Sequence, residues 1–121
     1  MNINTILRKD LLDTRITSLL GGNYVYKLHK DESEKHDIYV EYMIIREKEK
    51  SFAGNTNLSN EYLIQIDVFS KNGALVSKVM KKIKEVLKEK DYSFSYGTEG
   101  YESETSLYTE KIRVYKEVFN I

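Results

Sequence analysis

The fold is decided by the stretch EYLIQIDVFSKNGALVSKVMKKIKEVLKEK, residues 61–90, in which one hydrophobic pattern gives way to another. The first ten residues alternate between two sides, with Tyr62, Ile64, Ile66 and Val68 on one and Leu63, Gln65, Asp67 and Phe69 on the other. A period of two with β-branched and aromatic residues predicts a half-buried strand. After Asn72, a good helix N-cap, the apolar residues follow a helical period: Leu75, Val76, Val79, Met80, Ile83, Val86 and Leu87. We therefore expect an amphipathic helix, about residues 73–90, packed on a sheet that contains the preceding strand.

Length and composition limit the class of protein. The 121 residues are expected to form a single domain, residues 1–121, large enough for one hydrophobic core. A formal net charge of zero gives no overall attraction to nucleic acid or to an anionic membrane. The absence of cysteine excludes disulfides, thiol catalysis and thiolate metal sites. No apolar run is long enough to span a membrane and no leader pattern is present, so we expect neither export nor membrane insertion.

The first twenty residues are expected to form two helical segments. Their apolar residues fall on two faces, Ile3, Leu7 and Leu11 on one and Leu12, Ile16, Leu19 and Leu20 on the other. A single straight helix would expose one of these sets. We expect a helix over residues 2–12, a cap at Asp13, and a shorter helical segment that ends at the glycines at positions 21 and 22.

The next forty residues are expected to alternate between strand and loop. Residues 24–28 are suited to a short edge strand, and residues 29–37 to a charged loop. Residues 38–46 are apolar on both sides, which predicts a strand covered by a helix on one face and by a neighbouring subunit on the other. Residues 47–60 are expected to form a long irregular segment that begins as an exposed ribbon. Phe52 and Leu58 in this segment either contact a partner or fold back on the body.

Two further strands complete the predicted sheet. Residues 91–96 alternate, with Tyr92, Phe94 and Tyr96 assigned to one face, and residues 106–119 form the last strand. We assign the intervening residues 97–105, which include Gly97 and Gly100, to a hairpin turn region. The predicted fold is therefore α+β, a mostly antiparallel sheet of about four strands with an N-terminal helix and the helix of about residues 73–90 packed on it.

Few residues suggest chemistry. His29 and His36 lie in a loop rich in carboxylates but lack a metal-ligand spacing, so a solvated loop is the favoured interpretation. Asp67 could act as a buried general acid or base, but no partner base or nucleophile is evident, and an outward-facing sheet residue is favoured. No phosphate-binding, dinucleotide-binding or nucleophile motif is present. We predict no catalytic, cofactor-binding or metal-binding residue and no enzyme activity.

Charge is distributed unevenly along the chain. The helix of about residues 73–90 carries six lysines, among them Lys81 and Lys82, against two glutamates. Three interpretations of these lysines are open: a solvated helix face, a site that binds an acidic protein surface, and a site that contacts nucleic-acid phosphates. The stretch around Glu99, Glu102 and Glu104 carries no cation. We hypothesise that the acidic segment of one copy meets the basic helix of the next, a head-to-tail contact that can close into a ring.

Taken together, these segments resemble a known family. The pattern consists of an N-terminal helix before Gly-Gly-x-x-Val-Tyr (21–26), the strand Ile-Tyr-Val-x-Tyr (38–42), a long polar loop, and Tyr-x-Ile-x-Ile-Asp-Val-Phe-Ser (62–70) leading into a lysine-rich helix. It ends with Tyr101, Thr105, Leu107, Tyr108, Ile112, Arg113 and Val114. Over nearly the whole chain this resembles the tail-completion, or head–tail joining, proteins of long-tailed bacteriophages and prophages, whose fold is similar to that of tail terminators.

The resemblance implies a structural role in the virion. Such proteins form a ring, expected to be hexameric, that caps the tail tube, joins it to the head connector or head-completion protein, and lets DNA pass without sequence-specific binding. It implies location at the head–tail junction of the virion, after assembly in the host cytoplasm. We name as candidate interface residues Tyr39, Met43, Phe52, Leu58, Lys81, Lys82, Glu99, Glu102 and Glu104. The alternatives are a small nucleic-acid-binding or regulatory protein that uses the lysine-rich helix, and a small metal-dependent enzyme.

Overall fold

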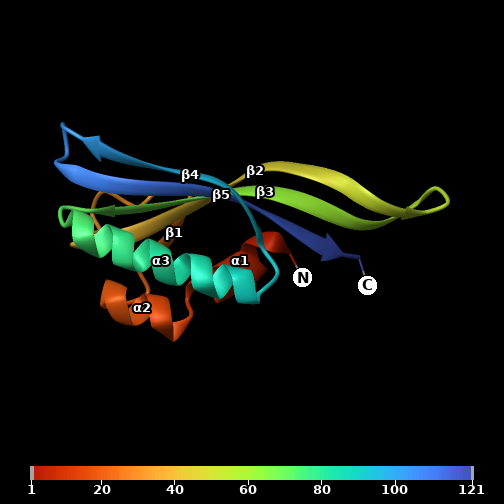
Figure 1. Cartoon of the computed structure of the whole chain (residues 1–121), viewed down its shortest axis with the longest axis horizontal. Coiled ribbons are helices and arrows are strands. Elements are labelled where there is room, and N and C mark those ends of the chain that lie inside the picture. Colours follow the sequence, from red (N-terminus) through yellow and green to blue (C-terminus); the bar gives the residue numbers. More distant parts are fainter. Residues whose placement is uncertain (1, 121) are drawn as a thin grey trace.

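A computed structural model describes residues 2–120, which form one sheet with three helices on one of its faces (Figure 1). The helices are α1 (Ile3–Leu11), α2 (Thr14–Leu20) and α3 (Gly73–Glu89). The strands are β1 (Val25–Lys27), β2 (Ile38–Ala53), β3 (Thr56–Ser70), β4 (Ser93–Glu102) and β5 (Leu107–Phe119). The α+β prediction is confirmed, but the described residues form five strands rather than about four.

The helix boundaries follow from their caps. Asn2 accepts hydrogen bonds from the backbone amides of Asn4 and Thr5, Asp13 accepts one from Arg15, and Asn72 accepts one from Leu75. Gly21 ends α2 in the left-handed conformation, at a φ of 81°. The break at Asp13 lets both apolar faces of the N-terminal segment reach the core, as predicted.

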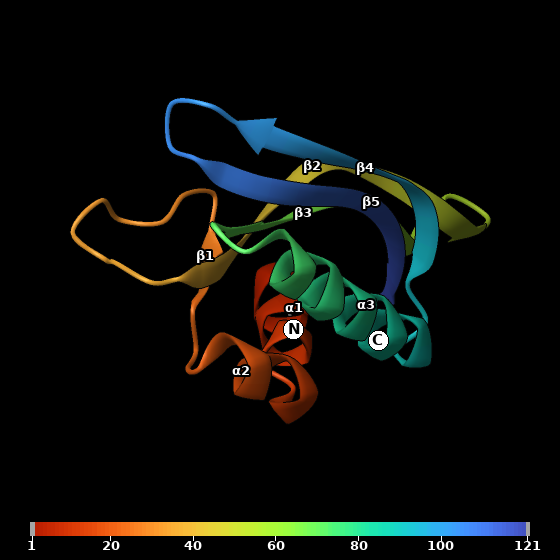
Figure 2. The same cartoon turned by 60° about the vertical axis from the view of Figure 1, so that its left-hand side comes forward.

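The sheet order is β1-β2-β3-β5-β4. β2, β3, β5 and β4 pair antiparallel, and only the short edge strand β1 runs parallel to its neighbour. In Figure 2 the helices lie together beneath one face of the sheet, and no helix of residues 2–120 covers the opposite face. We call this opposite surface the open face.

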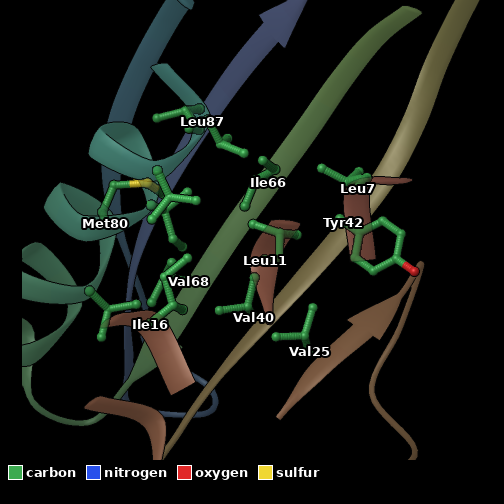
Figure 3. Close-up of a cluster of buried hydrophobic side chains, with 14 of the residues drawn as sticks. Leu7, Leu11, Ile16, Val25, Val40, Tyr42, Ile66, Val68, Met80 and Leu87 are labelled. Atoms are coloured by element: carbon green, nitrogen blue, oxygen red, sulfur yellow. The ribbon is translucent and has the colours of Figure 1, made fainter. Parts of the chain in front are cut away.

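The core lies between the helices and the inner face of the sheet (Figure 3). Fully buried side chains come from every layer and include Leu7, Leu11, Ile16, Val40, Ile64, Ile66, Val68, Val79, Met80, Ile83 and Ile112. The alternation predicted for residues 61–70 places Ile64, Ile66 and Val68 inward, as expected. Burial of each large apolar side chain contributes about 1.5–3 kcal/mol before the entropy cost is subtracted.

The prediction of an irregular segment over residues 47–60 is wrong, although its exposed ribbon is confirmed. β2 and β3 continue as a paired hairpin to Ala53 and Thr56, joined by Gly54 and Asn55. Gly54 has a φ of 62°, the conformation that a two-residue hairpin loop needs at its first position. We call residues 47–60 the arm, because it extends beyond the helices (Figure 1).

The hairpin turn predicted at Gly97 and Gly100 is also wrong. Both glycines lie inside β4, and the turn falls at residues 103–106, where Ser106 has a φ of 58°. A Cβ added at Gly97 would come within 3.2 Å of Ile112, and one at Gly100 within 2.9 Å of the Thr109 hydroxyl. These glycines therefore allow β4 to lie close to the side chains of β5 instead of reversing the chain.

Candidate assembly surfaces

The open face carries the first two predicted interface residues. The ring of Tyr39 stacks on Phe69 with centroids 5.0 Å apart, and the Lys30 ammonium lies 5.1 Å from the Tyr39 centroid. Burial raises the pKa of Tyr39 to about 12, so its hydroxyl stays protonated at neutral pH. Met43 lies four residues further along the same strand and is 37% exposed. Both side chains reach the open face, and their contact with a partner stays a prediction.

The centre of the open face is a polar network. Arg113 donates a hydrogen bond to Gln65 at 3.2 Å, and Gln65 donates one to Asp67 at 3.4 Å. Asp67 lies opposite Lys111 in the register, and burial raises its pKa. Its partners are therefore an amide and two cations of the sheet, which fits the outward-facing structural role favoured from the sequence.

The arm places Phe52 and Leu58 beyond the helices. They are 53% and 38% exposed, so neither folds back into the core. The base of the arm is fixed to β5 through Glu117, which accepts hydrogen bonds from the hydroxyls of Ser59 at 2.5 Å and Ser51 at 3.0 Å. These bonds lower the pKa of Glu117. The network keeps the arm extended while its apolar tip stays in solvent.

The lysines of α3 border a groove of about 480 Å³ between α2 and α3. Lys81 and Lys82 line this groove with Lys78 and Arg15. Lys82 also pairs with Glu85 at 3.2 Å, and Arg15 is held by Asp13 and Glu89. The groove is cationic and exposed, which suits an acidic protein surface as well as a phosphate.

The predicted acidic residues lie at the end of the β4–β5 hairpin. Glu99, Glu102 and Glu104 are exposed, and Glu102 accepts a hydrogen bond from the Thr105 hydroxyl at 3.2 Å. Figure 1 shows this hairpin end on the sheet side of the molecule, with α2 on the opposite side. Within one chain the acidic residues and the basic groove are therefore separate surfaces.

Sequence reasoning missed the exposed aromatic residues of β4. Phe94, Tyr96 and Tyr101 are all more than 40% exposed, and all ten residues of β4 are exposed. The prediction that Tyr92, Phe94 and Tyr96 share a face is wrong, because a bulge between Phe94 and Tyr96 places Tyr96 opposite Arg113 and Phe94 opposite Val114. The signal that could have located this surface was the alternation itself, in a strand without lysine or proline to protect its edge.

The histidines are not brought together. His36 stacks on Tyr24 with centroids 3.5 Å apart and lies 3.0 Å from Glu34, whereas His29 lies 3.5 Å from Glu41. Across residues 2–120, no three His, Cys, Asp or Glu side chains are placed to hold a metal ion. No helix in the same part of the chain is long and apolar enough to cross a membrane.

Comparison with known proteins gives a match by structure. No family model and no curated protein sequence matches the chain. Among solved structures, one similar chain comes from "Virion of native gene transfer agent (GTA) particle", with a TM-score of 0.72 over 94% of this chain and 92% of that one. The fold is shared with a virion protein. At 13% sequence identity this similarity concerns the fold alone. As a similarity of fold, it confirms the resemblance to virion proteins that was expected from the sequence.

Proposed function

We propose that this chain is a structural protein of a phage or prophage virion that acts at the head–tail junction. It assembles as a ring on the end of the tail tube and offers a surface to the head connector. The observation that carries this proposal is the amount of exposed apolar side chain. Ten large hydrophobic residues within residues 2–120 are at least 36% exposed, and five of them lie on the arm and β4. Surfaces of this kind mark protein–protein contacts.

The distribution of charge supports a head-to-tail contact between copies. Glu99, Glu102 and Glu104 lie on a different surface from Lys81 and Lys82, so neither group can satisfy the other within one chain. Two unlike, complementary surfaces generate a ring when the rotation between copies closes. The zero net charge of the chain also leaves DNA free to pass through such a ring without strong retention.

Reversal of the lysine charges tests the contact. In a protein with Lys81→Glu and Lys82→Glu, self-association should weaken strongly, and raised salt should weaken the wild-type association as well. A matched control is Lys9→Glu with Lys27→Glu, which changes the net charge equally at exposed lysines of α1 and β1 that line a different groove. Equal effects from both pairs would show a general charge effect and contradict the contact.

The role at the junction is tested in the particle. When the gene for this chain is removed, DNA-filled heads and unattached tails should accumulate, and supply of the protein to such an extract should join them. Normal particles without the chain would contradict the proposal. Binding of DNA by the isolated protein with a steep salt dependence would instead favour the nucleic-acid-binding alternative.

A further inference from the structure

A groove of about 390 Å³ lies between the C-terminal end of α3 and β4, and we call it the acceptor groove. Its walls are mainly apolar and include Leu87, Tyr92, Phe94, Ile112 and Val114. Tyr92 turns its hydroxyl away to donate to Asp10 at 2.8 Å, so that its ring faces the groove without an unpaired polar group. Phe94 forms the edge and is 56% exposed, although no described element covers it.

Two lysines give the acceptor groove a cationic rim. The Lys84 ammonium lies 5.3 Å from the centroid of the Phe94 ring and 3.5 Å from Glu110. Lys88 is exposed, and its ammonium makes no hydrogen bond or ion pair with any other residue in the range 2–120. An apolar groove with a free cation beside it fits an apolar side chain that is accompanied by a carboxylate.

The tip of the arm has these properties. Phe52 and Leu58 are its exposed apolar side chains. Glu49 is also exposed, and its carboxylate makes no hydrogen bond or ion pair with another residue between 2 and 120. The other two glutamates of the arm hairpin are occupied, Glu61 by Lys50 at 2.8 Å and Glu47 by Asn60 at 2.7 Å. From Glu47 to Ala53 the arm spans about 23 Å at the usual rise of a strand.

We propose that the arm tip of one copy inserts Phe52 and Leu58 into the acceptor groove of the next copy, with Glu49 beside Lys88. Phe52 on the arm and Phe94 at the edge of the groove are both exposed, and the same chain carries the complementary charges of Glu49 beside the one and Lys88 beside the other, which argues for a second copy as the occupant. The two surfaces differ, so the contact can repeat around a ring. This inference rests on the proposed function and adds which surfaces hold neighbouring subunits together.

Charge exchange between Glu49 and Lys88 tests the pairing. Glu49→Lys and Lys88→Glu should each weaken self-association, and the protein with both changes should regain most of it, as measured by sedimentation. Phe52→Ser should weaken association by about tenfold or more, whereas Leu28→Ser, at an equally exposed leucine in a loop, should not. Single changes without effect, or a double change that only adds the two losses, would overturn the inference.

A crosslink identifies the partner directly, because the chain contains no cysteine. Ala53→Cys and Lys88→Cys proteins, mixed and oxidised, should give a disulfide-linked heterodimer in preference to either homodimer, and Leu28→Cys should not replace Lys88→Cys. A ring that forms but links elsewhere overturns the inference and leaves the proposed function intact. A protein that neither associates nor crosslinks contradicts both, and linkage of the arm to a different virion protein overturns the inference.

Discussion

Removal of one buried hydroxyl, in Tyr92→Phe, should destabilise the fold without changing the apolar lining of the acceptor groove. Tyr92 is 6% exposed, and its hydroxyl bonds Asp10, which links the start of β4 to α1. Burial, followed by the nearby carboxylate, raises the pKa of Tyr92, so the hydroxyl remains a donor at neutral pH. A hydrogen bond to a charged group contributes about 1.5–3 kcal/mol.

The lower end of that range applies here, because Asp10 is half-buried and water can reach it after the substitution. We therefore expect a loss of about 1.5 kcal/mol, or about 5–8 °C in Tm for a domain of this size. Chemical and thermal denaturation measure the loss. Tyr96→Phe is the matched control, since the Tyr96 hydroxyl makes no hydrogen bond with any residue in 2–120, and its change should stay within about 0.5 kcal/mol. Equal losses in the two variants would refute the reasoning.

Three further substitutions probe the open face and the arm. Because burial raises the pKa of Asp67 above the usual value of an aspartate, its contribution to stability is largest in acid and falls as pH rises through the folded pKa. Asp67→Asn should therefore be more stable than wild type at pH 7 and lose this advantage near pH 3, as measured by denaturation. A less stable variant at pH 7 would contradict this. Glu117 has a lowered pKa, so its hydrogen bonds to the arm hold at neutral pH and are lost as pH falls through the folded pKa. Glu117→Gln should speed amide hydrogen exchange in residues 47–60 at pH 7. Unchanged protection of these amides would show that other contacts hold the arm. Gly54→Val forces a β-branched residue into a φ of 62° and should disorder the arm tip, visible as lost NMR cross-strand contacts, while the core stays folded.

The sequence predicts best what local rules determine. Asp13 and Asn72 each cap a helix as expected, because a short polar side chain is followed by an apolar period of 3.6. Asn2 was assigned to the first helix and is instead its cap. The inward set of β3 was readable because alternation fixes which side chains share a face. The burial of these inward-facing side chains could be predicted without knowing which strands pair with β3.

The errors arise where pairing between distant segments decides the structure. Gly97 and Gly100 suggested a turn, yet they fit against β5, a reason that depends on Ile112 and Thr109. The arm is strand because β2 and β3 pair through charged residues that have no hydrophobic pattern, such as Lys50 with Glu61. Its hairpin loop could have been found from Gly54 and Asn55 between alternating segments.

The candidate surfaces show the same division. The sequence left open whether Phe52 and Leu58 point to a partner or fold back on the body. The extended arm, which holds both side chains in solvent, excludes the second possibility. The acceptor groove could not be predicted, because it brings α3 and the start of β4 together with β5, whose groove residues lie more than twenty positions beyond those of α3. Tyr96 in particular does not share the face of Tyr92 and Phe94, because a bulge is invisible to a simple alternation.

The most direct test of this account is the mass of the protein in solution and on isolated tails. The chain has a mass of 14.2 kDa, and a ring requires one discrete multiple of this mass at high concentration or on tail ends, with subunits released by high salt. The account predicts that single multiple. A mass that stays at one chain under all these conditions, or an open series of ever larger species, would contradict it.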